Sequence, residues 1–187
     1  MRIQSGIHKG RSIHPKVTSK TRPTTARVRK AIFDTLFGKF DLNGTLVLDL
    51  FAGTGSLGFE AGSRGASAVT FVEYDHSSVQ GLNRSVAAIA KDGGTRYKVV
   101  QRDVFSYLAG APESADICFC DPPYRFDEWE RLLTMVPAGY LVAESNREIG
   151  GSQLWTQTTL KVYGDTVVSF LSRNNDVMQP FSREDES

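Results

Sequence analysis

The residues best suited to chemistry form the tetrapeptide Asp121-Pro122-Pro123-Tyr124, which follows the apolar run ADICFC. The Asp121 carboxylate and the Pro122 carbonyl can accept the two N–H groups of an exocyclic base amine, which draws electron density back to its nitrogen. Tyr124 can stack on the base, a contact worth roughly 1–3 kcal/mol. Asp and Pro also form ordinary turns, but Pro122 and Pro123 together give a rigid backbone with exposed carbonyls. The pattern indicates an amine positioned as a nucleophile, with no metal required.

A glycine-rich loop at the end of the apolar run TLVLDL (45–50) indicates an adenosine-bearing cofactor. Gly53, Gly55 and Gly58 satisfy G-x-G-x-x-G, which lets the backbone turn sharply and approach a ligand, although this match alone is weak. Glu73 ends the next expected strand, 20 residues after Gly53. A carboxylate at that place can accept both ribose hydroxyls.

Two further acids favour S-adenosylmethionine over a nicotinamide cofactor. Asp49 stands directly before the loop, where it would repel a pyrophosphate but could receive a cationic amino-acid group, directly or through water. Asp103 closes the third expected strand, where it could accept the adenine amino group beside the Val104 amide. The alternative for Asp103 is a helix N-cap. A bound sulfonium and a held amine together predict methyl transfer.

Strands and helices alternate from residue 45 onward. We expect strands at 45–50, 66–75, 98–103, 114–121 and 139–145, helices at 56–65, 76–91 and 127–136, and a terminal hairpin of 160–166 and 167–173. Repeated βαβ units predict a mostly parallel, seven-stranded α/β sheet with helices on both faces, which binds ligands beyond its strands' carboxyl ends. The length fits one domain, at 1–173, followed by a polar tail at 174–187 that we expect to be disordered.

Positive charge is concentrated near the start of the chain. Residues 1–30 contain nine Lys and Arg and no acid, so the remainder has 13 basic residues against 21 acidic ones. A helix capped by Thr24 or Thr25 would bury Val28 and Ile32 and display cations on its other side. We expect residues 1–38 to contact a polyanion and to act as a lid, a solvated arm being the alternative. The cations expected to contact this polyanion are Lys9, Arg11, Arg27 and Lys30.

Other features limit the location and cofactor chemistry. No apolar run is long enough to cross a bilayer, and the basic N-terminus lacks the apolar segment of a signal peptide. Cys118 and Cys120 lie two apart in one expected strand, so they face the same side and cannot form a disulfide framework. Neither these cysteines nor the three histidines have metal-ligand spacing. We therefore expect a reduced, cytoplasmic protein without a metal site.

These motifs together resemble the bacterial 16S rRNA (guanine-N2)-methyltransferase family that acts on guanine 966. The resemblance runs from residue 1 to about 173, through the opening MRIQSGIHKGR and the segment TRPTTARVRKAIFDTL (21–36). It continues through DLFAGTGSLGFEAGSRGA (49–66), the DPPY turn and KVYGDT (161–166). The arm differs by Lys9 and Arg11, since it is otherwise more often rich in glycine and arginine, and the acidic tail has no family counterpart.

The resemblance implies a Rossmann-like class I methyltransferase that uses S-adenosylmethionine. It implies a monomer that acts on 16S rRNA, within a small ribosomal subunit or an assembly intermediate. It places 22–24 near the methionine end of the cofactor, Glu73 at the ribose and Asp103 at the adenine. The full set of expected cofactor residues is Arg22, Pro23, Thr24, Asp49, Phe51, Ala52, Gly53, Gly55, Glu73, Tyr74, Asp103 and Val104.

Two other functions remain open from the residues. A DNA adenine-N6 or protein glutamine-amide methyltransferase would use a similar Pro-Pro-Tyr turn, but 187 residues leave no space for a DNA-reading domain. A non-catalytic RNA-binding module would not need Asp121 and Tyr124 beside an intact glycine loop. Incorporation of labelled methyl into rRNA, ribosomal subunits or DNA separates these possibilities.

Overall fold

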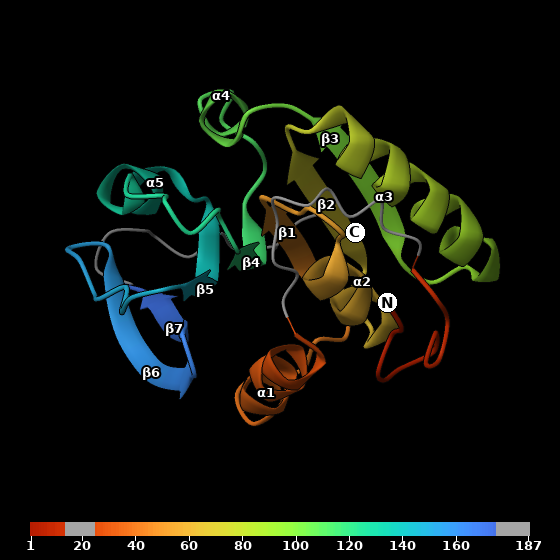
Figure 1. Ribbon diagram of the computed structural model, residues 1–187, viewed down its shortest axis with the longest axis horizontal. Coiled ribbons are helices and arrows are strands. Elements are labelled where there is room, and N and C mark those ends of the chain that lie inside the picture. The colour runs from red at the N-terminus through yellow and green to blue at the C-terminus, as the bar shows by residue number, and fades with distance from the viewer. Residues whose placement is uncertain (14–24, 175–187) are drawn as a thin grey trace, which may run out of the picture.

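The computed structural model describes residues 1–13 and 25–174, in which strands and helices alternate after the first helix (Figure 1). The helices are α1 (Ala26–Phe37), α2 (Ser56–Ser63), α3 (His76–Ile89), α4 (Val104–Leu108) and α5 (Trp129–Met135), with a short 3-10 turn, η1 (Ala90–Asp92). The strands are β1 (Leu46–Leu50), β2 (Ala68–Glu73), β3 (Arg96–Gln101), β4 (Ala115–Cys120), β5 (Ala138–Ser145), β6 (Trp155–Tyr163) and β7 (Thr166–Arg173).

The strands form one seven-stranded sheet in the order β3-β2-β1-β4-β5-β7-β6. Strands β1 to β5 pair in parallel, and β7 pairs antiparallel with both β5 and β6. This confirms the predicted α/β sheet and its terminal hairpin. The hairpin turns two residues earlier than expected, at Gly164, because this glycine adopts a φ of 61° that L-residues rarely take.

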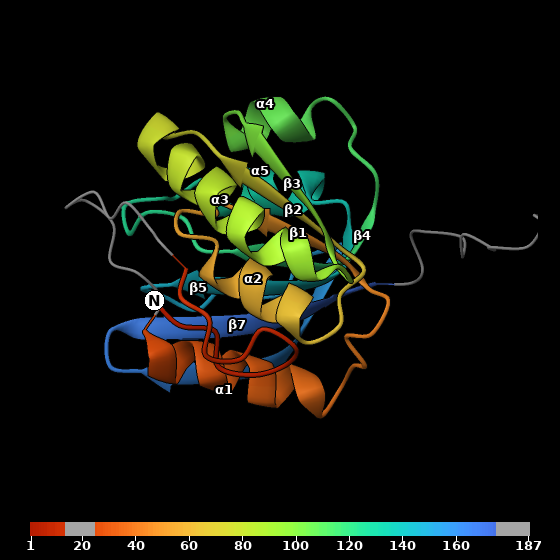
Figure 2. The same cartoon turned by 90° about the vertical axis from the view of Figure 1, so that its right-hand side faces the viewer.

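Alternate residues of the buried strands face two separate cores. Val47, Phe119 and Val142 face the helices α1, α2 and α3, whereas Leu48 and Cys120 face α4 and α5. This alternation follows from the period of two along a strand. The result is a sheet between two helical layers, with α1, α2 and α3 on the same side in Figure 2. Cys118 shares the orientation of Cys120, and both are buried free thiols, as the spacing predicted.

The order in which strands are added to the sheet reverses at β1: β2 and β3 lie on one side of it, and β4 and β5 lie on the other. The loop after β1 leads to α2 on one face, and the loop after β4 leads to α5 on the other. In an open parallel sheet, two such loops diverge and leave a crevice beyond the carboxyl ends of the strands. Both predicted chemical motifs therefore lie at the one place where this fold binds ligands.

Residues 1–13 fold back onto α2 instead of extending into solvent. Arg2 and Ser12 form an antiparallel bridge, and Ile3 and Ile13 are buried. The Ile7 amide donates to the Ser63 carbonyl (2.8 Å) at the end of α2. This part of the segment is therefore folded onto the domain, and its contact with a polyanion stays a prediction.

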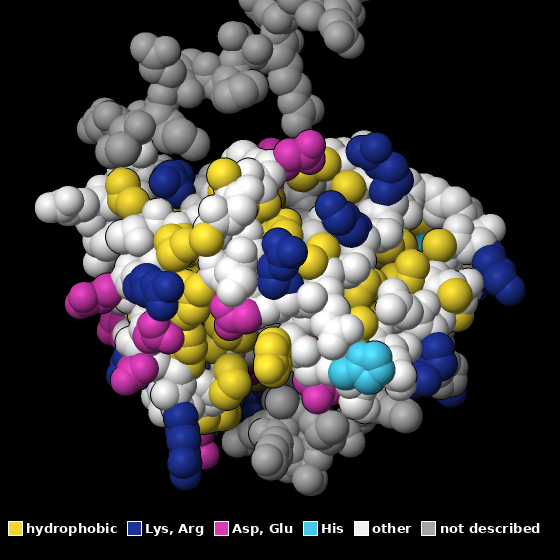
Figure 3. All heavy atoms as spheres, turned by 90° about the horizontal axis from the view of Figure 1, so that it is seen from above, with side chains coloured by type: hydrophobic (Ala, Val, Ile, Leu, Met, Phe, Trp, Pro, Cys, Tyr) yellow, Lys and Arg dark blue, Asp and Glu magenta, His cyan; other side chains and the backbone are white. Residues whose placement is uncertain are grey.

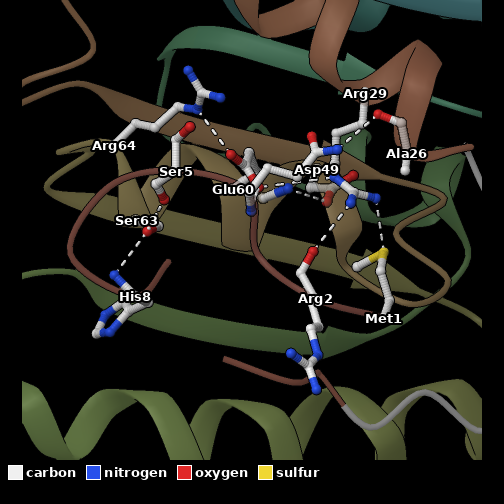
Figure 4. Close-up of polar contacts among 12 residues, drawn as sticks. Met1, Arg2, Ser5, His8, Ala26, Arg29, Asp49, Glu60, Ser63 and Arg64 are labelled. Atoms are coloured by element: carbon white, nitrogen blue, oxygen red, sulfur yellow. Dashed lines mark hydrogen bonds and ion pairs between the residues drawn. The ribbon is translucent and has the colours of Figure 1, made fainter. Parts of the chain in front are cut away.

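A buried acid, Glu60, joins the arm to α1 and α2 (Figure 4). Its carboxylate accepts hydrogen bonds from the Gln4 backbone N–H (2.8 Å) and from Arg64 Nε (3.0 Å), and Arg29 Nε lies 3.8 Å away. Arg29 is only 2% exposed, and its burial lowers its pKa. Arg29 thus belongs to the core and is not one of the cations that α1 displays to solvent.

Candidate functional site

The loop after β1 has three residues in the left-handed region: Phe51 (φ 56°), Gly53 (φ 52°) and Gly55 (φ 72°). For a residue with a side chain, such as Phe51, this conformation costs about 1–2 kcal/mol. A Cβ on Gly55 would lie 2.6 Å from Leu82 Cδ2, so the loop packs too tightly there for a side chain. A Cβ on Gly53 would meet nothing closer than 3.8 Å, which leaves that position open for a ligand. Ala52 donates its amide to Val72 and fixes the loop on β2 (3.1 Å).

Glu73 lies at the end of β2 and is held by the backbone of two neighbouring segments. Its Oε2 accepts from the Gly53 amide (2.7 Å), and its Oε1 accepts from the Asp75 amide (2.7 Å). A carboxylate oxygen has about two lone-pair sites, so each retains one for a ribose hydroxyl. The structure therefore brings Glu73 to the glycine loop, as its spacing from Gly53 predicted.

Asp49 is 3% exposed and points beneath the first turn of α2. Its Oδ2 accepts from the Gly58 amide (2.9 Å). Burial raises the pKa of Asp49 to about 8; the Gly58 hydrogen bond opposes this shift, and the charge of Glu73 adds to it. A Cβ on Gly58 would come within 2.3 Å of Phe71 Cε1 and 2.9 Å of this carboxylate. Gly58 therefore serves the close packing of α2 on the sheet, with the Asp49 carboxyl directly behind the loop.

The structure places Asp103 differently from the sequence expectation. Strand β3 ends at Gln101, and Asp103 caps α4 by accepting the Ser106 amide through Oδ1 (2.9 Å). The N-cap alternative thus holds, and the exposed carboxylate keeps its other oxygen available. Val104, the next residue, is buried, whereas Tyr74 after β2 is 76% exposed. Contact of these residues with an adenine stays a prediction.

The DPPY segment directly follows β4, at the strand end where it was expected. Asp121 is half-buried and Pro122 is buried, while Pro123 and Tyr124 face solvent. The Phe126 amide donates to the Pro123 carbonyl (2.8 Å) and closes a turn around Tyr124. The tyrosine side chain is 44% exposed and is thus free to receive a planar group.

The sequence analysis did not predict the aromatic cluster that lies behind this turn. The ring of Phe126 meets Phe51 edge-on at 5.2 Å between centroids and Trp129 edge-on at 5.3 Å, and it stacks near Phe105 at 6.2 Å. The guanidinium of Arg131 lies 4.0 Å from the Phe105 centroid. The spacing of Phe126 and Trp129 was a possible signal, because both interrupt a charged segment at the start of a predicted helix. Their contacts link the loop after β1 to the turn after β4.

The predicted RNA-binding cations lie on two segments, the N-terminal arm and α1. Arg27 and Lys30 are exposed on the first half of α1, and Lys30 pairs with Asp34 (2.6 Å). In Figure 2 this helix begins at the left, where α2 and α3 also begin. Lys9 and Arg11 are exposed on the arm, and Arg11 donates to the Ala88 carbonyl near the end of α3 (3.2 Å). The arm contacts the ends of α2 and α3, and these two helices run back toward the amino ends of the strands. The structure therefore does not bring Lys9 and Arg11 to the predicted site. The capping of α1 by Thr25 is confirmed.

Some expected features fall elsewhere or lie outside the described chain. Arg22, Pro23 and Thr24, and nearly all of the tail at 174–187, lie outside the described residues.

A hollow of about 720 Å³ is lined by Ser5, Phe37 and Arg64, among others, at the amino end of the sheet and thus away from the site. Within residues 1–13 and 25–174, no helix could span a membrane and no three His, Cys, Asp or Glu cluster as metal ligands.

The strand order, the glycine loop after β1 and the antiparallel hairpin define the fold of the class I methyltransferases. The chain belongs to the family described as conserved hypothetical protein 95, whose sequence model matches residues 1–172. This match includes the N-terminal arm, α1, the strands β1 to β6 and all but the last residue of β7.

Relatives with curated names are similar over most of the chain. The ribosomal RNA small subunit methyltransferase D of Escherichia coli K12 is 35% identical over 146 residues, covering 78% of this chain and 71% of that protein. The protein of the same name from Haemophilus influenzae is 28% identical over 181 residues, covering 91% of both. The solved structure of Escherichia coli yhhF matches with a TM-score of 0.79 and 31% identity over 92% of this chain and 97% of that one.

Proposed function

We propose that this protein transfers a methyl group from S-adenosylmethionine to the exocyclic N2 amine of a guanine in 16S rRNA. The observation that carries the proposal is the meeting of two motifs at the reversal point of the sheet. Glu73 and Gly53, hydrogen-bonded to each other, form a site suited to an adenosine ribose. Asp121 and Tyr124 follow the adjacent strand β4, and Phe51 contacts Phe126 between the two loops. The similarity to small-subunit rRNA methyltransferases D supports rRNA as the substrate.

The residues present fit the cofactor by their chemistry. Glu73 offers acceptors for the ribose hydroxyls, Gly53 leaves room for close approach, and Asp49 offers a buried carboxyl to a cationic group. We assign the remaining contacts to Phe51, Ala52, Gly55, Tyr74, Asp103 and Val104 and, outside the described residues, to Arg22, Pro23 and Thr24. When bound, S-adenosylmethionine supplies an electrophilic methyl group on a positively charged sulfur.

The DPPY segment prepares the amine for attack. The Asp121 carboxylate and the Pro122 carbonyl accept its two N–H groups, so the nitrogen lone pair points away from the turn. Positive charge develops on nitrogen as its bond to the methyl carbon forms and the carbon–sulfur bond breaks, and the negative Asp121 stabilises this charge. One of the two N–H protons is then released from the nitrogen. Tyr124 stacks on the extruded guanine and Pro123 keeps the turn rigid. Positioning and electrostatics account for this chemistry without a metal ion.

The acceptor is tested by incorporation of labelled methyl into naked 16S rRNA, small ribosomal subunits and DNA, followed by mapping of the modified base. We expect N2-methylguanine in small-subunit rRNA or in an assembly intermediate. Label in DNA adenine or in protein glutamine would instead establish one of the other amine acceptors. Binding of rRNA without any transfer would reduce the protein to an RNA-binding module.

Replacing Glu73 with alanine should weaken S-adenosylmethionine binding at least tenfold, equivalent to about 1.4 kcal/mol. The variant removes the ribose acceptors and also frees the Gly53 and Asp75 amides that the carboxylate holds. Calorimetric titration measures the affinity, and Glu73→Gln, which keeps one acceptor oxygen, should lose less. Unchanged affinity in Glu73→Ala would exclude Glu73 from the cofactor site.

Reversing two charges on α1, by Arg27→Glu with Lys30→Glu, should raise the KM for rRNA strongly. Extruding a guanine costs a few kcal/mol, which phosphate contacts from this helix would offset. The salt slope of RNA binding should fall by about one unit per lost contact. Stability should hardly change, because both side chains are exposed and the Lys30–Asp34 pair is solvated (2.6 Å, with side chains 66% and 55% exposed).

The matched control reverses two other exposed cations, by Arg96→Glu with Lys161→Glu, at the amino end of β3 and on β6. Lys and Arg side chains also lie among hydrophobic ones on the surface seen in Figure 3. The control variant has the same change in net charge as the α1 variant, so it separates the effect of net charge on RNA binding from the loss of contacts at α1. Equal RNA affinity and equal salt slope in the α1 variant and the wild type would place the RNA contacts elsewhere.

A further inference from the structure

Phe126 contacts both segments that the proposed reaction needs. Its backbone amide donates to the Pro123 carbonyl (2.8 Å), which closes the turn that carries Tyr124. Its ring meets the Phe51 ring edge-on, with 5.2 Å between centroids and 65° between planes. Phe51 is the first residue after β1 and is followed directly by Ala52 and Gly53. One residue thus joins the target turn to the cofactor loop.

The contact between the Phe126 and Phe51 rings matters because the backbone of Phe51 has an unfavourable conformation. Phe51 has a φ of 56°, which is unfavourable for a residue with a Cβ and persists only where the surroundings enforce it. The Ala52 amide is fixed on the Val72 carbonyl (3.1 Å), and the Phe51 ring packs against Phe126 on the opposite side of the reversal point. Removing the Phe126 ring would therefore let Phe51 relax.

Relaxation of Phe51 would reach the cofactor residues through the backbone. Gly53 lies two residues later and donates its amide to Glu73 Oε2 (2.7 Å). A shift of the loop would consequently displace the carboxylate proposed to hold the ribose. The Phe126 ring itself is held from behind by Trp129 at 5.3 Å and by Phe105 at 6.2 Å, so it forms a fixed support.

We propose that Phe126 is a positioning residue that couples the cofactor loop to the target-base turn by packing against the strained Phe51. The inference rests on the proposed function, because the two coupled segments are those that would hold the methyl donor and the amine. Methyl transfer in line requires both groups within a fraction of an ångström of their reactive positions, so a loose support lowers the rate even where each segment still binds.

The experiment measures cofactor affinity by calorimetry and single-turnover methyl transfer to rRNA for Phe126→Ala, Phe51→Leu and the double variant. Phe126→Ala should weaken S-adenosylmethionine binding about fivefold and slow transfer about thirtyfold. Phe126→Leu, which restores much of the buried volume, should recover most of both. Because the two rings act through one contact, the double variant should bind the cofactor no more weakly than the worse single variant.

Phe33→Leu is the matched control, because Phe33 is fully buried and packs on Phe119 in the other core, away from the site. It should lower Tm without changing cofactor affinity or the rate of transfer. Wild-type affinity and rate in folded Phe126→Ala, or additive losses of cofactor affinity in the double variant, would overturn the coupling. If the wild type binds the cofactor but methylates no rRNA, the proposed function fails while the affinity cycle still tests the Phe51–Phe126 contact. If it binds no cofactor, both proposals fail.

Discussion

Asp121→Ala should abolish methyl transfer, with a loss of about a thousandfold or more, while S-adenosylmethionine affinity stays within a few fold. The proposed partner of Asp121 is the target amine, and the backbone that follows is held by Pro122, Pro123 and the Phe126 amide. Removing the carboxylate takes away both an N–H acceptor and the negative charge that stabilises the methylated nitrogen. The missing interaction therefore concerns the transition state more than the bound cofactor.

Single-turnover transfer to rRNA, with calorimetric titration of the cofactor, separates the two effects. Asp121→Asn should retain part of the activity, because its amide oxygen still accepts one N–H but carries no charge. Asp127→Ala removes an exposed acid six residues further along the same loop and should leave the rate unchanged. Turnover at the wild-type level in Asp121→Ala would end the proposed mechanism.

The order of elements was predictable because β1, β4 and β5 are buried on both faces and read as continuous apolar runs. Their ends were less predictable, since tertiary contacts decide them. Strand β3 stops at Gln101 because Asp103 turns its side chain to cap α4. The hairpin turns at Gly164 because that residue takes a positive φ. In each case a local hydrogen bond or backbone conformation moved a boundary by about two residues.

The strand-end residues of the site were predictable for a topological reason. Glu73 and Asp121 each follow or end a buried parallel strand, and parallel strands bring their carboxyl ends to one edge. Contacts between distant segments gave no such signal. The burial of Arg29 beside Glu60, and the meeting of Phe51 with Phe126, depend on how α1 and α5 pack, which no periodicity in the sequence specifies.

Asp49→Asn should weaken S-adenosylmethionine binding about a hundredfold at pH 8, equivalent to roughly 2.7 kcal/mol. The buried carboxyl, with a pKa of about 8, is mostly protonated in the free protein at neutral pH. A cationic ligand beside it favours the ionised form, so binding releases a proton. Wild-type affinity should therefore rise with pH between 6 and 7, by up to about tenfold per unit. Asparagine keeps an acceptor for the Gly58 amide but cannot ionise, so this dependence should disappear.

The same substitution should stabilise the ligand-free protein, increasingly so at higher pH. The pKa of Asp49 is raised from 3.8 in the unfolded chain to about 8 in the fold, so the folded state holds the proton more tightly. Its contribution to stability is present in acid and is lost as pH rises from about 4 to about 8. The Tm advantage of Asp49→Asn should thus grow between pH 5 and pH 8, to roughly 3 °C or more. Asp127→Asn, at an exposed position, is the control and should change neither the Tm nor the pH dependence of cofactor binding. If cofactor binding by Asp49→Asn keeps the pH dependence of the wild type, another group releases the proton.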